Sequence, residues 1–446
     1  MARIVIPVGP ALLMARLNTA GFEAQVVGGC VRDSLLGRRP NDWDICTSAR
    51  PEQIQRCFQG ERVIETGLKH GTVTVLLEGV PYEITTYRTD GAYSDGRHPD
   101  SVQFVSSLKA DLARRDFTIN AMAAGPDGLV QDPYGGQMDL AAGIIRCVGD
   151  PALRFQEDAL RLLRAMRFAS TYKFIVEEGT RVQIHQQRAL LTQIAGERIQ
   201  VELEKLLMGC GVRPVLEEFH DVLSVVIPEL APLAGFAQHN PWHLWDIWQH
   251  TIIAIDQAIY DPIVRLALLL HDIAKPAVFT LDKRGIGHFY GHAQAGSEDA
   301  KILLRRLRYD NETRHNVATL VAVHDTLINP EAKSVRRWLN RLGESQLRRL
   351  FAVKRADTLA HNPALTAEEL ASLEQAEKQM DQILEEGQCF SLKDLAVNGR
   401  DLIAAGLHAG PTLGIVLRQL MDLVLDGSIE NDRQALLDHV KTLASD

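Results

Sequence analysis

Residues 24–47 read AQVVGGCVRDSLLGRRPNDWDICT, and this stretch decides the fold of the N-terminal part of the chain. An apolar run ends at Gly28 and Gly29, a short amphipathic segment follows, and Asp42 and Asp44 then lead into a second apolar run. Because side chains at positions i and i+2 of an extended chain point to the same face, the two aspartates present their carboxylates together. The stretch predicts a strand, a glycine turn, a short helix and a second strand that begins with an acidic pair.

The acidic pair and the glycine turn together suit a nucleotide with its metal ions. Mg²⁺ prefers hard oxygen ligands and keeps water or phosphate oxygens in its remaining positions. A pair of such ions can activate an attacking hydroxyl group and neutralise a leaving pyrophosphate. Gly28 and Gly29 supply backbone N–H groups at the start of a helix, which favours a triphosphate. An Asp-x-Asp pair alone is usually a solvated loop, so the prediction depends on the two features occurring together.

The rest of the chain divides into a part rich in strands and a longer helical part. Apolar and β-branched runs predict strands at 24–27, 43–46, 72–77, 82–87 and 102–105, with helices at 11–20 and 31–36. Farther along, amphipathic patterns predict helices at 153–170, 198–208, 213–224, 247–260, 262–271 and 297–307. We therefore predict an α+β fold with four domains: a head at 1–150, a helical neck and body at 151–235, a helical metal-binding domain at 236–360 and a helical tail at 361–446.

The composition excludes several classes of protein. The chain has 446 residues, with 48 Lys and Arg against 57 Asp and Glu, and its net charge of −9 gives no global attraction to nucleic acid or membranes. Any RNA must therefore meet a local basic face. Six cysteines without C-x-x-C spacing fit neither a disulfide framework nor a zinc knuckle. Since no apolar run is long enough for a membrane span, we expect a reduced, soluble, cytoplasmic protein.

Several motifs of the first part resemble one enzyme family. Gly28–Asp33 followed by Asn41–Asp44 resembles the bacterial class II branch of the tRNA nucleotidyltransferase and poly(A) polymerase family, within the DNA polymerase β superfamily. The resemblance continues in TTYR at 85–88, in YSDGRHP at 93–99, which is similar to the family's flexible loop, in RRDFTIN at 114–120 and in DPYGG at 132–136. It implies a polymerase-β-like head that transfers nucleotides.

The resemblance implies that Asp42 and Asp44 hold catalytic Mg²⁺ and that Glu83 is the third carboxylate of the site. Glu83 lies on a predicted strand between Tyr82 and Ile84. An isolated buried acid would cost free energy there, and a metal partner would remove that cost. The alternative is an ordinary acid on the exposed side of a strand.

The same resemblance assigns a set of nucleotide-binding residues, which are Gly28, Gly29, Arg32, Arg115, Asp116, Asn120, Asp158, Arg161, Arg164 and Arg167. Asp116 and Asn120 lie about one helical turn apart and fit contacts to a ribose 2′-hydroxyl, the group that distinguishes RNA from DNA precursors. Arg115 either meets phosphates or belongs to a solvated basic pair.

The segment EDALR, residues 157–161, is predicted to open the first long helix after the head and resembles the family's amino-acid template. Asp158 and Arg161 are i and i+3, so on a helix they share a face and form a flat array of acceptors and donors. Cytosine and adenine offer an amine to Asp158 and a ring nitrogen to Arg161, whereas uracil and guanine present the reverse polarity. Without the resemblance, the pair would be interpreted as an intrahelical salt bridge.

A second set of residues, in the helical half, has the composition of a metal site. The order of His250, His271-Asp272, His292, His324 and Asp357 resembles the HD phosphohydrolase superfamily, and LHDIAKP at 270–276 is similar to its central signature. Imidazoles with carboxylates suit Mn²⁺, Fe²⁺, Ni²⁺ or Co²⁺, which activate water for attack on 2′,3′-cyclic or terminal phosphates. Other histidines, such as His239, His243 and His288, are expected to be ordinary core or surface residues.

We therefore predict template-independent addition of CCA to the 3′ end of tRNA, with CTP and ATP as donors and without a DNA template. The alternatives are an A-adding enzyme, a poly(A) polymerase, a protein that acts mainly as an HD-type phosphohydrolase, and a non-catalytic RNA-binding scaffold. The flexible loop argues against CC-only addition, because CC-only relatives lack it. Cation pairs such as Arg305-Arg306 and Arg348-Arg349 are either a track for the tRNA backbone or solvated helix faces. The tail from Phe390 to Pro411 resembles that of bacterial family members and would also contact tRNA.

Overall fold

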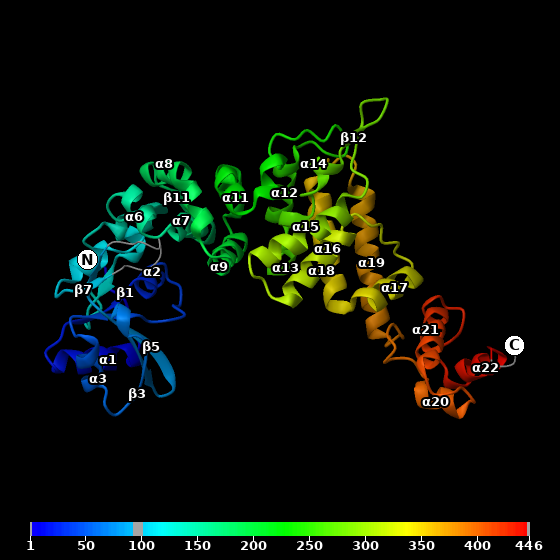
Figure 1. Ribbon diagram of the computed structural model, residues 1–446, viewed down its shortest axis with the longest axis horizontal. Coiled ribbons are helices and arrows are strands. Elements are labelled where there is room, and N and C mark those ends of the chain that lie inside the picture. Colours follow the sequence, from blue (N-terminus) through cyan, green and yellow to red (C-terminus); the bar gives the residue numbers. More distant parts are fainter. Residues whose placement is uncertain (1, 92–100, 444–446) are drawn as a thin grey trace. The chain divides into compact units, whose positions relative to one another are not determined.

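The computed structural model describes residues 2–91 and 101–443 (Figure 1). The chain divides into two compact units, residues 1–231 and 232–446. The first unit contains a β-sheet followed by helices, and the second is helical apart from a two-stranded hairpin. In the part of the chain that the structure describes, no helix has both the length and the apolar character needed to cross a membrane.

The sheet of the head consists of β1 (Ala24–Val27), β2 (Ile45–Thr47), β3 (Arg62–Gly67), β4 (Thr72–Leu77), β5 (Val80–Thr86), β8 (Ala123–Ala124) and β9 (Val130–Gln131). The strand order is β3-β4-β5-β2-β1-β8-β9. Strands β2 and β5 pair in parallel, and the other neighbours pair antiparallel. Alternation along β4 buries Val73, Val75 and Leu77 on one face of the sheet.

Short elements surround this sheet. They are α1 (Val8–Thr19), α2 (Gly29–Leu35), α3 (Pro51–Cys57), η1 (Leu68–His70), β6 (Arg88–Asp90), β7 (Val102–Phe104), α4 (Leu108–Ala113), η2 (Thr118–Asn120), α5 (Gly136–Ala142) and β10 (Ile144–Ile145). Helix α1 contacts β1 and β2, and α3 contacts β4 and β5, so these two helices cover the sheet (Figure 1).

The glycine turn between β1 and α2 has the form that the sequence predicts. Gly28 has a φ of 79°, and a Cβ atom at this position would lie only 2.8 Å from Nη1 of Arg115. Glycine alone satisfies both conditions. The Gly28 N–H donates to the Met122 carbonyl, and the Val27 N–H donates to the Asp44 carbonyl, both at 3.0 Å. These bonds fix Asp44 against the turn.

Helices complete the first unit. They are α6 (Pro151–Glu157), α7 (Leu160–Tyr172), α8 (Glu178–Gln187), η3 (Arg188–Gln193), α9 (Gly196–Leu207), α10 (Val212–Glu218), α11 (His220–Val226) and η4 (Pro228–Leu233), with β11 (Ile175–Val176) paired to β10. The prediction of one continuous helix at 153–170 is wrong, because Asp158 has an extended backbone with φ −145° and ψ 102°. Its side chain accepts a hydrogen bond from the Leu160 N–H and so caps the start of α7.

The second unit is a bundle of helices. They are α12 (Ile247–Gln257), α13 (Pro262–Leu270), α14 (Lys275–Val278), α15 (His292–Arg306), α16 (Asn311–Val323), α17 (Ala332–Leu342), α18 (Glu344–Ala360) and α19 (Ala367–Glu385), with the hairpin β12 (Thr280–Leu281) and β13 (Gly287–His288). Helix α13 is apolar along almost all of its length and is buried against α12, α16 and α18. This burial explains why its sequence lacks a polar face.

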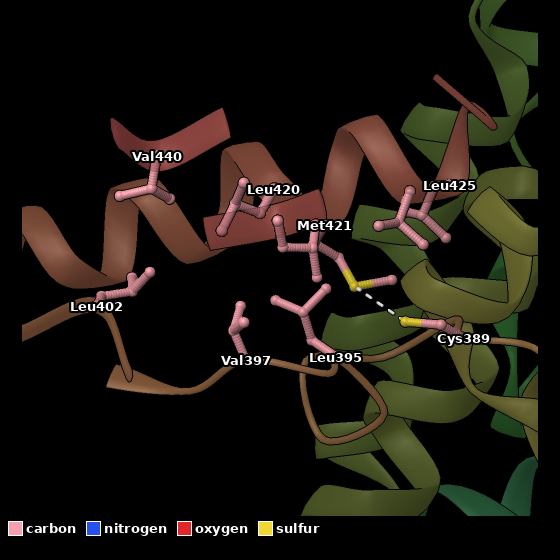
Figure 2. Packing of buried hydrophobic residues seen from close by; sticks show 10 residues of the cluster. Cys389, Leu395, Val397, Leu402, Leu420, Met421, Leu425 and Val440 are labelled. Atoms are coloured by element: carbon pink, nitrogen blue, oxygen red, sulfur yellow. Dashed lines mark hydrogen bonds between the residues drawn. The ribbon is translucent and has the colours of Figure 1, made fainter. Parts of the chain in front are cut away.

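The C-terminal helices have a core of their own. Helices α20 (Gly399–Ala404), α21 (Pro411–Leu425) and α22 (Arg433–Leu443) enclose a small apolar cluster. Figure 2 shows Leu402, Leu420 and Val440 directed toward one another, with Met421 beside Cys389. The tail is attached to α17 through Arg337, whose Nε donates to Asp426 at 2.9 Å.

The predicted α+β fold is confirmed. The strands predicted at 24–27 and 72–77 have the bounds of β1 and β4. Strand β3 was not predicted, because its sequence RVIETG alternates weakly and ends in polar residues. The helix predicted at 213–224 is interrupted at Phe219, between α10 and α11.

Candidate functional site

Two further carboxylates of the head, Asp42 and Glu83, lie near Asp44, where β2 and β5 begin to pair. The parallel register joins Ile45 to Ile84, so the preceding residues on the two strands, Asp44 and Glu83, are neighbours. Burial, followed by the negative charges of Asp42 and Glu83, raises the pKa of Asp44 to about 6, and the Arg115 guanidinium partly offsets this rise. A cluster of mutually repelling carboxylates fits a divalent cation, so the residues present suit Mg²⁺.

The position of Glu83 corrects part of the sequence argument. The side chain of Glu83 is exposed, so the expected cost of burying an isolated acid does not apply. Its proximity to Asp44 follows from strand pairing, since Glu83 contributes to the raised pKa of Asp44.

The raised pKa of Asp44 predicts a pH-dependent metal affinity. Because protons and cations compete for the same carboxylate, Mg²⁺ affinity of the head should fall about tenfold per pH unit below pH 6 and level off above it. The same shift makes the metal-free protein lose stability as the pH rises toward 6, since the folded state favours protonated Asp44. Calorimetric titration with Mg²⁺ between pH 5 and pH 8 measures the affinity, and thermal melts of the metal-free protein over the same range measure the stability. Asp44→Asn should bind weakly at every pH, and a flat wild-type profile would contradict the prediction.

A cavity of about 270 Å³ lies beside the carboxylates, between the head and α7. Five arginines, two aspartates and a leucine line it: Arg114, Arg115, Arg161, Arg164, Arg198, Asp116, Asp158 and Leu160. The excess of guanidinium groups suits a polyphosphate. Arg115 lines the cavity, approaches Gly28 and lowers the pKa of Asp44, so it links the cavity to the carboxylates.

A buried hydrogen-bond network forms one wall of this cavity. Arg164 donates to Oδ2 of Asp116 through Nε at 2.9 Å and Nη2 at 2.6 Å, and Asn120 Nδ2 donates to Oδ1 at 3.0 Å. Nη1 of Arg32 donates to Asn120 Oδ1 at 2.6 Å. Burial opposes ionisation, yet Arg164 and Asn120 hold the pKa of Asp116 well below its ordinary value. Asp116 is therefore a fixed anion that orients Arg164.

Asp158 and Arg161 both line the cavity, although no helix face brings them together. Oδ2 of Asp158 accepts from Arg198 Nη2 at 2.8 Å. Nη1 of Arg161 donates to Glu157 at 2.6 Å, and Nη2 donates to the Arg114 carbonyl at 3.0 Å. Each side chain is thus held by other residues, and the interpretation as an intrahelical salt bridge between the two does not describe this structure.

Two further arginines and one motif of the predicted site lie elsewhere. Arg167 pairs with Glu202 on α9, and its guanidinium carbon lies 3.8 Å from the centre of the Phe168 ring, so it supports the neck. Arg32 also lies over Phe168, at 5.1 Å. The motif at 93–99 that is similar to the family's flexible loop lies outside the described residues.

The six histidines and aspartates predicted in the second unit converge. We call them the histidine–aspartate cluster: His250 on α12, His271 and Asp272 after α13, His292 at the start of α15, His324 after α16 and Asp357 on α18. His250 Nε2 lies 3.3 Å from His271 Nε2 and 2.8 Å from Asp357 Oδ1. His292 Nε2 lies 3.2 Å from His324 Nε2.

Backbone contacts orient the imidazoles of this cluster. Nδ1 of His271, His292 and His324 lies 2.7, 2.8 and 2.8 Å from the carbonyl oxygen three residues earlier in each case. Donation through Nδ1 assigns the lone pair to Nε2 in these three rings, so Nε2 of His292 and Nε2 of His324 face each other as acceptors. A cation between them would remove this mismatch.

Asp272 lies between the two histidine pairs. Its Oδ2 is 3.1 Å from His271 Nε2, and its Oδ1 is 3.5 Å from His292 Nε2. Both oxygens are buried and lack a hydrogen bond of regular geometry from the described residues, although Lys275 Nζ lies 2.7 Å from Oδ2. A bridging carboxylate with imidazoles on either side fits borderline divalent cations. A cavity of about 370 Å³ gives access to the cluster.

Sequence reasoning did not include His243 and His361 in this site, although both line the same cavity. His361 follows Asp357 by four residues at the end of α18, a spacing that could have indicated it. His243 lies in an irregular segment, and no spacing connects it to the cluster.

The sheet, its converging carboxylates and the arginine-lined cavity define a nucleotidyltransferase head. Residues 24–146 match the family described as the poly(A) polymerase head domain. Residues 173–233 match the probable RNA- and SrmB-binding site of polymerase A, and residues 286–440 match a putative tRNA nucleotidyltransferase domain 2.

Proteins that are similar to nearly the whole chain indicate a more specific family within this class. The chain is 38% identical to the CCA-adding enzyme of Limosilactobacillus fermentum over 435 residues, covering 95% of this chain and 94% of the relative. It is 34% identical to that of Geobacillus thermodenitrificans over 432 residues, with coverage of 95% and 94%. The crystal structure of the Bacillus stearothermophilus CCA-adding enzyme in complex with CTP matches with a TM-score of 0.74 at 30% identity, covering 98% of this chain and 96% of that one. The chain belongs to the CCA-adding enzyme family of tRNA nucleotidyltransferases.

Proposed function

We propose that this chain adds CCA to the 3′ end of tRNA from CTP and ATP, without a nucleic-acid template and by a two-metal reaction. The observation that carries the proposal is the position of three carboxylates, Asp42, Asp44 and Glu83, beside a cavity lined by five arginines. Relatives over nearly the whole chain are named CCA-adding enzymes, and a similar structure was solved with CTP.

The three carboxylates would hold Mg²⁺, which when bound activates the 3′-hydroxyl and neutralises the leaving pyrophosphate. Arg115 would contact the triphosphate from its position between Gly28 and the cavity. Asp116, which lines the cavity, and Asn120, which donates a hydrogen bond to it, would contact the ribose 2′-hydroxyl. The helical tail would also contact the tRNA.

Asp158 and Arg161 would select the base. Asp158 accepts the amine of cytosine or adenine, and Arg161 donates to a ring nitrogen, whereas uracil and guanine would set like groups against each other. The contacts from Arg198 and Glu157 support this role, because they hold the two side chains in place before a base enters.

Extension of tRNA transcripts tests the proposal. Transcripts that end before CCA, after C and after CC are incubated with Mg²⁺ and each nucleotide triphosphate alone or CTP with ATP. We expect the shortest transcript to gain a complete CCA with CTP and ATP, and UTP and GTP to be rejected. Extension of only the CC-ending transcript, by ATP, would make this an A-adding enzyme, and no extension at all would refute nucleotidyl transfer.

The histidine–aspartate cluster supports a second function, metal-dependent hydrolysis of a phosphoester. The carrying observation is the pair of facing Nε2 atoms on either side of Asp272. The cluster would bind Mn²⁺, Fe²⁺, Ni²⁺ or Co²⁺, which when bound supply an activated water for attack on phosphorus. Lys275, held by Gln238 at 2.9 Å and close to Asp272, would keep the carboxylate oriented.

Substitution of one cluster residue should separate the two functions. His271→Ala is expected to lower metal content and to reduce hydrolysis of a 2′,3′-cyclic nucleotide about 100-fold or more, while CCA addition is unchanged. His239→Ala, which changes a histidine outside the cluster, should affect neither. Equal hydrolysis by wild type and His271→Ala would remove the cluster from the reaction.

A further inference from the structure

His243 and His361 form a second histidine group beside the histidine–aspartate cluster. His243 precedes α12, and His361 follows α18. Their ring centroids are 4.6 Å apart, and they lie 5.2 Å and 5.0 Å from the ring of His250, respectively. One ligand nitrogen from each of the three rings lies within 4.8 Å of the other two. The fold thus brings three imidazoles from separate segments to one point.

Hydrogen bonding within the fold does not account for this arrangement. Nδ1 of His243 and Nδ1 of His361 are buried and have no hydrogen-bond partner among the described residues. Buried polar atoms in native proteins are normally paired, so two adjacent exceptions need an explanation. The contrast with His271, His292 and His324 is direct, because each of those rings has a backbone carbonyl beside Nδ1.

We propose that His243 and His361 bind a third divalent cation, besides one at each facing Nε2 pair of the histidine–aspartate cluster, and that they share the His250 ring. Because His250 Nε2 faces the main cluster, Nδ1, which lies 3.4 Å from the Ala360 carbonyl, would bind the new cation and release its proton to water. The inference rests on the proposed phosphohydrolase site, which supplies His250. Three imidazoles favour Zn²⁺, Ni²⁺ or Co²⁺ over Mg²⁺, since the group offers nitrogen in place of hard oxygen. Asp357 supplies negative charge nearby, because its Oδ1 lies 3.7 Å from His361 Nε2.

The position of this group indicates what the cation would do. His243 and His361 line the 370 Å³ cavity, whereas His250 is 1% exposed. The open coordination positions of the cation would therefore face the cavity, where a phosphate oxygen of a substrate can bind.

Metal analysis of the full-length chain tests this. The background is a variant with Asp42→Ala and Asp44→Ala, in which the head holds no ion. This variant is loaded with Zn²⁺ and desalted, and its zinc content per chain is measured by mass spectrometry. We expect three zinc equivalents per chain, and two after adding either His243→Ala or His361→Ala. His288 lines the same cavity but lies outside the group, so a variant with His288→Ala should keep three zinc equivalents per chain.

Other results would overturn the inference in distinguishable ways. Two equivalents that neither substitution lowers would refute the third cation and leave the proposed phosphohydrolase site standing. No zinc in the background chain would refute both. A fall to one zinc equivalent or none in His361→Ala would assign His361 to the histidine–aspartate cluster instead. Thermal melts of both variants at the wild-type temperature would show that a loss of one equivalent does not come from misfolding. Titration with Co²⁺ gives a second measurement, since loss of a bound Co²⁺ removes its visible absorption.

Discussion

Asp44→Ala should abolish nucleotide addition, with a fall of about 1,000-fold or more in the rate of CTP incorporation, because removing a metal ligand removes several kcal/mol of transition-state stabilisation. The thermal stability of the metal-free protein should not fall. Burial and the charges of Asp42 and Glu83 raise the pKa of Asp44 to about 6, so at neutral pH the ionised side chain opposes folding. Single-turnover incorporation and a thermal melt measure the two effects.

Glu52→Ala is the matched control for this prediction. Glu52 is an exposed acid of the head in the first turn of α3 and lies outside the carboxylate group. Its removal should leave incorporation unchanged. Substantial incorporation by Asp44→Ala at saturating Mg²⁺ would exclude Asp44 as a metal ligand.

Asp158→Asn should change which base is accepted. The amide keeps an oxygen that can cap α7 and adds an N–H donor for O4 of uracil, where the carboxylate has only acceptors. We expect the ratio of UTP to CTP incorporation to rise by about 5- to 150-fold, the range that corresponds to 1–3 kcal/mol for a base-reading contact. Competition between CTP and UTP on one transcript measures this ratio.

Asp150→Asn controls for the loss of a helix-capping carboxylate. Asp150 caps α6 through the Ala152 N–H at 2.8 Å, as Asp158 caps α7, but it is exposed and outside the arginine-lined cavity. The ratio of UTP to CTP incorporation by Asp150→Asn should stay at the wild-type value. An unchanged ratio in Asp158→Asn would show that base choice depends on other residues.

The proximity of Asp42 to Asp44 could be predicted because local rules determine it. Asp42 and Asp44 share a face through the two-residue period of an extended chain, and the glycine turn fixes where that strand begins. The approach of Glu83 depends on the parallel pairing of β2 with β5, which the sequence alone does not specify. Its exposure was one of the two readings that the sequence left open, since strand alternation does not show which face of the first residues is covered.

Asp158 and Arg161, the pair proposed to select the base, show a different limit of prediction from sequence. The sequence EDALR favours a helix, and nothing in local propensity indicates that Asp158 leaves it. The break depends on a capping contact to Leu160 and an ion pair with Arg198 on α9, which is distant in sequence. Similarly, the order of residues predicted the six members of the histidine–aspartate cluster. The packing of α12 against α18 was needed to bring His243 and His361 to His250.

The ion pair between Asp116 and Arg164 joins the head to α7 and therefore limits where the chain can be shortened. A fragment that ended at residue 150 would keep Asp116, which is 8% exposed, and lose the guanidinium that neutralises it. It would also lose Phe168 and Tyr172, whose rings cover Arg32 at 5.1 and 5.0 Å. Removal of α7 would also expose Phe117, which is fully buried and packs edge-on against the Phe168 ring at 5.7 Å, and exposing apolar surface to water costs free energy. Residues 1–150 should therefore not survive alone as a folded piece, whereas residues 1–231 retain both partners of the pair.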